Sequence, residues 1–280
     1  MIKASEKALT QSGLSPENID LVISAPSLIT SYGLEIPSVA IQKSLGLHHA
    51  ECINISQGCV GILRAIQLAH QFIMSNATIQ DVLVAAGCAT SAITKNQTHG
   101  SFFWSDGAVA ILITGKPGEG LHFVHFSEIS AKESLGAMHI KYGDAVSPDQ
   151  LLDLDTFYIT TEFESDVAKL EYIRSEPLSF YAVFDSLLQS QNLREEDLEA
   201  FFLPSLGKNR VPFLFQEREH LIAKLQTDFR YGHIAGVDVF LFLTDYVCSK
   251  KPECAAWFAL FSAAFTAQWG GLLLQYRPSG

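Results

Sequence analysis

Positive charge is scarce in this sequence. Its 280 residues contain 19 Lys and Arg against 30 Asp and Glu, a formal net charge of -11. No basic stripe is present that would neutralise a phosphate backbone, so we exclude nucleic acid as the main partner. Phosphate-loop, dinucleotide-binding and H-E-x-x-H motifs are also absent, which leaves nucleotide binding and zinc-protease chemistry without support.

Long apolar runs and paired cysteines are lacking too. No stretch reaches the roughly 18 apolar residues that suggest a membrane span, and Met1 to Glu6 do not lead into a signal-peptide core. The apolar run from Ala255 to Phe265 is shorter than a span and indicates a buried strand and loop. The five cysteines form no C-x-x-C pair, which favours a reducing compartment. We therefore expect a cytoplasmic protein.

Apolar residues are plentiful, at 48% of the chain, enough for a large buried core. Continuous apolar segments alternate with helix-like ones, a pattern typical of an α/β protein whose sheet is buried on both faces. Helices are expected at about 2–12, 36–45 and 58–75, and strands at about 21–25, 52–55, 82–86 and 108–113.

The sequence also contains two similar halves. Leu14 and Leu193 lie 179 residues apart, each in a polar turn between a helix end and a strand. At an offset of 174, the helix that begins at Gly58-Cys59 corresponds to one near Gly232-His233. An internal duplication of an α/β unit explains both offsets most simply, and chance similarity of two such units is the alternative.

This repeat divides the chain into three parts. The halves are expected to span 1–115 and 177–280. The region 116–176 between them is more polar and less periodic, so we expect a connecting and cap region there, followed by a helix near 177–190.

Cys59 is the candidate nucleophile. It lies between a short apolar strand and a long helix, in Ser56-Gln57-Gly58-Cys59-Val60-Gly61. Unpaired N–H groups and the dipole at a helix N-terminus favour a thiolate, and the flanking glycines would let a thioester approach the sulfur. A buried structural cysteine is the alternative, because such cysteines are common.

Several short segments follow one another in an order typical of one enzyme family. They are Gly13-Leu14, Ile19–Ile23, Pro37-Ser38, Gly58–Gly61, Val82–Gly87 and Ser105–Ala108. With this series, residues 11–114 resemble β-ketoacyl carrier-protein synthase III, an initiating condensing enzyme, and its secondary-metabolite relatives. The resemblance implies a thiolase-like α/β fold in which two duplicated halves form a layered α-β-α-β-α core. It also implies that Cys59 carries the acyl group.

The second half resembles the same family but departs from it at the catalytic positions. Ser205 stands where the family has its first catalytic histidine, and Lys208 where that motif has asparagine. His233 stands in place of the catalytic asparagine. Phe261–Thr266 is similar to the family's glycine-rich loop, so the resemblance implies an oxyanion hole made by the backbone N–H groups of Cys59 and Ala263.

These departures change the chemistry that is expected. In the family, histidine and asparagine stabilise the enolate formed by malonyl decarboxylation, and the Ser205 hydroxyl is a much poorer stabiliser. His233 can still act as general base toward Cys59 or stabilise an oxyanion. We therefore expect acyl transfer from Cys59, in fatty-acid-like or secondary-metabolite biosynthesis. Weakened condensation and a non-catalytic subunit of a heteromeric ketosynthase-like enzyme are the alternatives.

The resemblance also implies partners. Acyl-CoA or an acyl carrier protein would supply the acyl group, so the coenzyme A or phosphopantetheine thioester is a substrate, and no resident cofactor or metal is expected. Arg210 matches a basic residue that contacts phosphopantetheine or carrier in the family, and Lys208 adds a second charge. A solvated surface arginine is the alternative. A homodimer, or a heterodimer with a ketosynthase-like subunit, is implied.

In the family a further strand precedes the point that Met1 matches, and we expect that strand in the middle of the first sheet. A missing central strand would leave backbone groups unpaired in the core. Three explanations stay open: the start lies upstream, a partner supplies the strand, or the sheet is rearranged.

Overall fold

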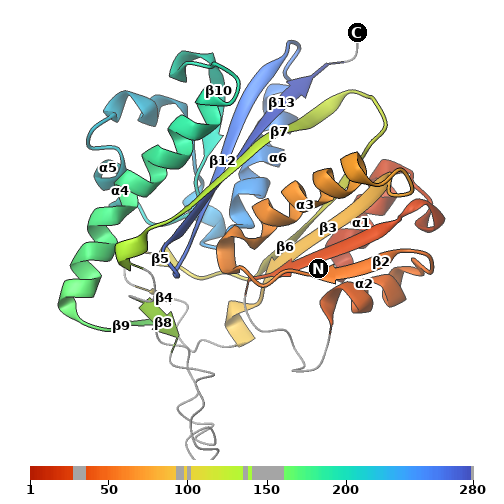
Figure 1. Ribbon diagram of the computed structural model, residues 1–280, viewed down its shortest axis with the longest axis horizontal. Coiled ribbons are helices and arrows are strands. Elements are labelled where there is room, and N and C mark those ends of the chain that lie inside the picture. Colours follow the sequence, from red (N-terminus) through yellow and green to blue (C-terminus); the bar gives the residue numbers. More distant parts are fainter. Residues whose placement is uncertain (28–35, 93–97, 100–101, 135–137, 141–160, 279–280) are drawn as a thin grey trace, which may run out of the picture.

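The computed structural model describes residues 1–27, 36–92, 98–99, 102–134, 138–140 and 161–278. Two β-sheets alternate with helices in five layers (Figure 1). The outer layers are α1 with α2 on one side and α4 with α5 on the other, and α3 and α6 lie between the sheets. This arrangement is the α-β-α-β-α core that the sequence predicts.

The first half contains the elements that the apolar pattern predicts. They are α1 (Ile2–Ser12), β1 (Leu21–Pro26), α2 (Pro37–Leu45), β2 (Glu51–Asn54), α3 (Gly61–Ser75), β3 (Asp81–Cys88) and β6 (Gly107–Thr114). A short 3₁₀ turn, η2 (Gly58–Val60), precedes α3. The sheet order is β2-β1-β3-β6, and only β6 runs antiparallel to its neighbour.

The second half repeats this plan. Its elements are β7 (Gly120–Ser130), α4 (Asp166–Gln189), β10 (Leu198–Phe202), α5 (Arg210–Leu214), β11 (Leu225–Gln226), α6 (Asp238–Lys250), β12 (Ala256–Ala264) and β13 (Gln268–Arg277). The order β11-β10-β12-β13 matches the order of the first sheet, and its last pair is again antiparallel. The internal duplication is therefore confirmed.

The region expected to connect the halves also contributes regular structure. Its strand β7 pairs antiparallel with β13 from Gly120 opposite Arg277 to Ser130 opposite Gln268. Two further antiparallel pairs are short: β4 (Thr98–His99) with β5 (Phe102–Phe103), before this region, and β8 (Met138–Ile140) with β9 (Thr161–Phe163), within it.

Helix α4 starts well before the position near 177 that the sequence suggests. The Ser165 side chain accepts a hydrogen bond from the Ala168 N–H and caps the new start. Pro177 lies inside this helix, although proline more often marks a helix boundary. The predicted helix start near 177 is wrong because the helix continues through Pro177, a residue type that local sequence preferences disfavour inside a helix.

The expected gap in the middle of the first sheet does not exist. Strands β2, β1, β3 and β6 are hydrogen-bonded one to the next without interruption. In the second sheet, the strand that comes first in the chain, β7, lies at the edge beside β13. The central position predicted for a first strand is therefore wrong, because the antiparallel strand separates it from the parallel ones.

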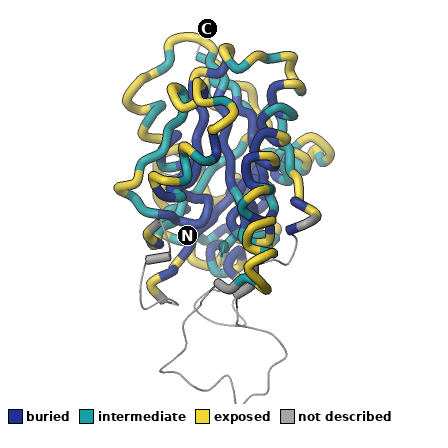
Figure 2. Tube along the Cα trace, turned by 90° about the vertical axis from the view of Figure 1, so that its left-hand side faces the viewer, coloured by how far each residue is buried: buried dark blue, intermediate teal, exposed yellow. Residues whose placement is uncertain are grey.

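The core is built by strand alternation. Leu21 and Ile23 of β1 face the cluster between the sheets, whereas Val22 faces the cluster beneath α1 and α2. In β10, Phe202 faces the same central cluster and Phe201 packs beneath α4. Both sheets are thus buried on two faces, and buried chain fills the centre of Figure 2 while exposed chain lies outside.

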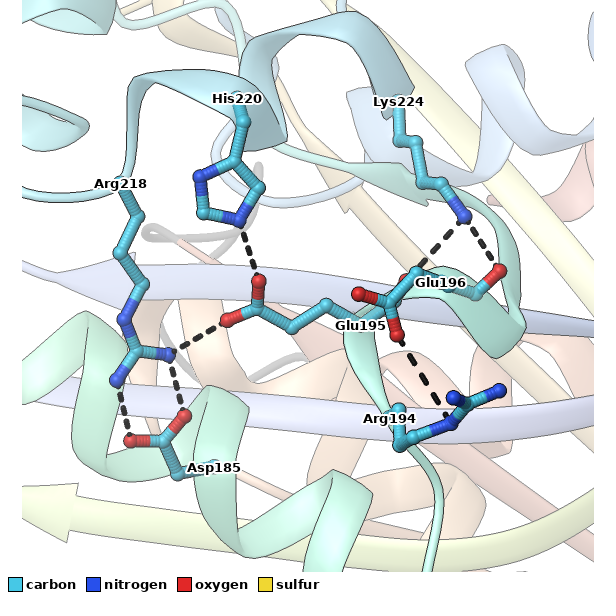
Figure 3. Close-up of polar contacts among 7 residues, drawn as sticks. All are labelled: Asp185, Arg194, Glu195, Glu196, Arg218, His220 and Lys224. Atoms are coloured by element: carbon cyan, nitrogen blue, oxygen red, sulfur yellow. Dashed lines mark hydrogen bonds and ion pairs between the residues drawn. The ribbon is translucent and has the colours of Figure 1, made fainter.

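An ion-pair network connects three elements on the outer face of the second half (Figure 3). The Arg218 guanidinium donates to both carboxylate oxygens of Asp185 at 2.6 and 2.8 Å, and to Glu195 at 3.1 Å. Glu195 also contacts His220, and the Lys224 ammonium donates to backbone carbonyls of Glu195 and Glu196. The network joins α4 to the 3₁₀ turns η6 (Glu195–Asp197) and η7 (Glu219–Lys224), so we assign it a structural role.

Among the helices in the described ranges, none is both long and apolar enough to cross a membrane. The expected cytoplasmic location stays a prediction.

Candidate active site

Cys59 lies in the middle layer, in the turn η2 directly before α3, as the sequence predicts. Only 5% of the residue is exposed, and it packs in the central cluster with Trp104 and Ala264. Burial raises the pKa of its thiol strongly, and the nearby Cys88 and Asp238 add to this rise. Desolvation at this buried position thus opposes the thiolate that the helix N-terminus is expected to favour.

The loop that carries His233 reaches the same place from the second half. The His233 N–H donates to the carbonyl of Phe103 at 2.7 Å, and the Ser105 N–H donates to the carbonyl of His233 at 3.0 Å. The Trp104 ring lies 5.0 Å from the His233 ring and 5.6 Å from Phe265, measured between centroids. A segment of the first half thus holds the His233 loop in position.

Two further contacts bring that loop against Cys59. Gly236 has φ of +84°, and a Cβ built on it would lie 2.2 Å from the Cys59 carbonyl oxygen. The Ser262 hydroxyl donates to that same carbonyl oxygen at 2.8 Å. Two segments of the second half, the His233 loop and strand β12, therefore enclose the carbonyl of Cys59, and only a glycine fits at 236.

His233 is buried, with 2% exposed, and its Nδ1 lies 3.2 Å from Oδ2 of Asp238. Helix α6 starts at Asp238, so His233 lies in the loop before the helix rather than at its N-terminus as predicted. Asp238 was not anticipated from the sequence. Its position at the start of the helix that repeats the Cys59 helix was the only available signal.

Ser205 is also buried next to Asp238. Its backbone N–H donates to Oδ2 of Asp238 at 2.8 Å, and its hydroxyl donates to the carbonyl of Asp228 at 2.8 Å. The hydroxyl proton is thus engaged with the backbone of its own half. Ser205 lies beside the His233 pair, but as a part of the scaffold.

The predicted oxyanion segment, Phe261–Thr266, is the end of strand β12 and the start of the turn that follows it. β12 pairs with β13 through Ala264, and Ala263 lies opposite Trp269. A Cβ built on Gly58 would lie 3.5 Å from the Cβ of Ala264, whereas Ala263 packs in the cluster beneath α4. The side chain that faces the Cys59 turn is therefore that of Ala264.

Arg210 lies at the start of α5 and is paired. Its guanidinium donates to a carboxylate oxygen of Glu176, a buried residue of α4. Burial raises the pKa of Glu176 to about 7, and the charge of Arg210 limits that rise. Lys208 is exposed nearby. Of the two predicted docking charges, one is therefore held by a buried carboxyl group.

Tyr172 occupies the same face of α4, one turn before Glu176. It packs with Ala131 and Ala267, and its ring lies 5.5 Å from that of Phe163. Burial raises the pKa of Tyr172, and Glu176 and Cys59 contribute smaller effects in the same direction. Tyr172 and Glu176 are thus buried ionisable side chains that the sequence did not predict, because α4 was expected to start after them.

The comparisons with known proteins agree with this fold. Residues 53–131 match the family model of 3-oxoacyl-[acyl-carrier-protein] synthase III. The β-ketoacyl-[acyl-carrier-protein] synthase III of Clostridium perfringens is 23% identical over 262 residues, 88% of this chain and 74% of that protein. Synthase III 1 of Bacillus anthracis is 34% identical over 142 residues, 50% of this chain and 44% of that protein.

Solved structures extend the similarity to nearly the whole chain. The 3-oxoacyl-[acyl-carrier-protein] synthase III of Aquifex aeolicus aligns with a TM-score of 0.77 and 18% identity, over 98% of this chain and 83% of that one. A structure titled ChlB3, an acyltransferase, aligns with a TM-score of 0.80 and 16% identity, over 99% of this chain and 82% of that one.

The duplicated halves, the layered core and the buried cysteine between the sheets define a thiolase-like α/β protein. Within that class, the sequence matches point to one group of condensing enzymes, which are transferases. The chain is thus similar to the β-ketoacyl-[acyl-carrier-protein] synthase III proteins, in sequence and in fold.

Proposed function

We propose that this protein is an acyltransferase in which Cys59 accepts an acyl group from acyl-CoA or an acyl carrier protein and passes it to an acceptor. One observation carries the proposal: the loop of a buried His–Asp pair packs against the backbone of a buried cysteine. Cys59 comes from one half, and His233 and Asp238 come from the equivalent place in the other.

Burial of Cys59 makes a neighbouring base necessary. Because the pKa of the thiol is raised, a thiolate must form during the reaction. In the first step His233 accepts the thiol proton, the sulfur attacks the thioester carbonyl, and the donor's C–S bond breaks. The departing thiol takes the proton back. In the second step His233 takes a proton from the acceptor, which attacks the acyl carbon. The bond between the acyl carbon and the Cys59 sulfur breaks, and the imidazolium returns the proton to that sulfur.

Ser205 favours transfer over decarboxylative condensation. Decarboxylation of a malonyl thioester leaves an enolate whose negative oxygen needs strong hydrogen-bond donors. The Ser205 hydroxyl already donates to the carbonyl of Asp228, so it offers little to such an oxygen. An acceptor that brings its own nucleophile, an amine, a hydroxyl or a preformed carbanion, needs no enolate stabilisation.

A non-catalytic subunit is the second candidate, and two observations favour it. Cys59 is almost fully buried, and Glu176 partly neutralises the charge of Arg210 that would attract an acidic carrier. In that case the active site of a ketosynthase-like partner would carry out the reaction, and Cys59 would serve packing alone.

Intact-mass measurement separates the two candidates. The purified protein is incubated with acetyl-CoA, octanoyl-CoA and the corresponding acyl carrier proteins, and its mass is followed. Catalysis predicts an acyl adduct that is absent in Cys59→Ala and present in Cys248→Ala, which removes an exposed cysteine as a control. If no donor of any chain length gives an adduct, the acyltransferase proposal fails.

A further inference from the structure

Asp238 is a fully buried carboxyl group in the interior between the two sheets. We infer that Asp238 is a positioning residue that fixes the protonation and orientation of the His233 ring, and that it stabilises the imidazolium formed during acyl transfer. The second part of this inference rests on the proposed function. The first part concerns the resting protein alone.

One carboxylate oxygen of Asp238 contacts two loops, those that carry Ser205 and His233. Oδ2 accepts the backbone N–H of Ser205 at 2.8 Å and lies 3.2 Å from Nδ1 of His233. A carboxylate accepts hydrogen bonds only, so Nδ1 must carry a proton in this contact. In the neutral ring the proton-accepting nitrogen is then Nε2, the atom required for a general base.

The other oxygen of Asp238 indicates that the residue is not there for packing. Oδ1 is buried and has no hydrogen-bond partner among the described residues. Leaving a polar oxygen unsatisfied costs on the order of 1 to 3 kcal/mol, and a buried charge costs more unless an opposite charge lies beside it. A protonated His233 supplies that charge.

A structural explanation competes with this one. Asp238 is the first residue of α6, and a carboxylate there stabilises a helix through its dipole. This role needs no contact with His233 and would be met equally well if the side chain faced solvent. The two roles differ in one measurable respect, which is the tautomer of His233.

The test is ¹⁵N NMR of the full chain with labelled histidine, with the His233 signals assigned by comparison with His233→Gln. In the wild-type protein we expect the neutral ring to carry its proton on Nδ1. In Asp238→Ala no oxygen remains to accept from Nδ1, so the preference for Nδ1–H should be lost. In Asp238→Asn the amide oxygen can still accept from the Ser205 N–H and from Nδ1, so that variant removes only the negative charge. Asp245→Asn is the matched control, because Asp245 is an exposed acid of the same helix.

The rate of Cys59 acylation provides the second test. The rate at which an acyl adduct forms on Cys59 should fall about 100-fold or more in Asp238→Asn, the range of a lost general base, and stay within about twofold in Asp245→Asn. If Asp238→Asn does not fold, the wild-type tautomer still decides, since a neutral ring protonated on Nε2 overturns the inference. If no donor acylates Cys59, the proposed function fails while the tautomer measurement still tests the positioning role.

Discussion

The hydroxyl of Ser262 donates a 2.8 Å hydrogen bond to the carbonyl oxygen of Cys59. The bond joins β12 of the second half to the turn that carries the cysteine in the first half. Gly236 closes around the same carbonyl from a third segment. The candidate site thus lies where the two duplicated halves contact each other. Substitutions in this contact should affect both stability and chemistry.

Gly236→Ala tests that coupling. The residue has φ of +84°, and an added Cβ would lie 2.2 Å from the Cys59 carbonyl oxygen and 2.6 Å from the Ser262 hydroxyl. Strain at positive φ and the forced shift of Cys59 should together cost about 3 kcal/mol or more. We expect a lower melting temperature and loss of the Cys59 acyl adduct. Gly118→Ala, where nothing lies within 4 Å, should change neither, and equal behaviour of the two variants would contradict this account.

Phe180 tests the core beneath α4. It is fully buried, and its ring contacts those of Phe184, Phe201, Phe215 and Phe261. Phe180→Ala should lower the free energy of unfolding by about 3 to 5 kcal/mol, because it leaves a cavity in a packed aromatic cluster. Leu178→Ala is the control on the same helix, since Leu178 is 66% exposed. Denaturant unfolding of both variants makes the comparison, and a loss below about 1 kcal/mol for Phe180→Ala would refute the assignment.

Glu176 predicts a pH dependence of stability. Burial raises its pKa in the folded protein to about 7, from an ordinary value near 4.5. Between these values the folded state binds more protons than the unfolded state, so stability falls as pH rises through this window and is level above it. Removing the group with Glu176→Gln should flatten the decline between pH 5 and pH 8 by about 3 kcal/mol.

Urea unfolding at several pH values measures this difference. Glu199→Gln, which removes an exposed glutamate that binds the Tyr246 hydroxyl, is the control. The decline should persist in that variant. Parallel pH profiles for wild type and Glu176→Gln would show that Glu176 ionises normally in the folded protein.

The sequence predicted the fold well because strand and helix patterns are local. Buried strands such as Val82–Ala86 are continuous apolar runs, and the repeat between Leu14 and Leu193 indicated two units of one architecture. Strand β7 was not predicted because its apolar residues lie in a region, 116–176, that is otherwise mostly polar. The start of α4 was misplaced because it precedes a proline.

The site was predicted in part. The resemblance to condensing enzymes made Cys59 and His233 candidates, and the structure brings the Cys59 turn and the His233 loop together. The resemblance gave no indication of Asp238 or Glu176. Asp238 contacts His233 in a loop whose course only the fold defines, and Glu176 contacts Arg210, which is distant in the chain. The sequence shows the helix start that favours a thiolate at Cys59 but not the burial that raises the pKa of its thiol.

Ser205→His tests the positional match on which the choice between transfer and condensation depends. Ser205 occupies the place of a catalytic histidine in the resemblance, and its backbone is held by Asp238 beside His233. An imidazole here would add a donor for an enolate oxygen, so decarboxylation of a malonyl thioester should rise about tenfold or more. Mass spectrometry of the thioester measures the loss of carbon dioxide.

Ser205→Ala separates the new donor from the loss of the Asp228 contact, because it removes the hydroxyl without adding an imidazole. It should leave decarboxylation at the wild-type rate. Thermal unfolding shows whether the larger side chain is accepted at this buried position. A folded Ser205→His protein with unchanged decarboxylation would mean that residue 205 does not face the acyl site, and the argument against condensation, which rests on Ser205, would then fail.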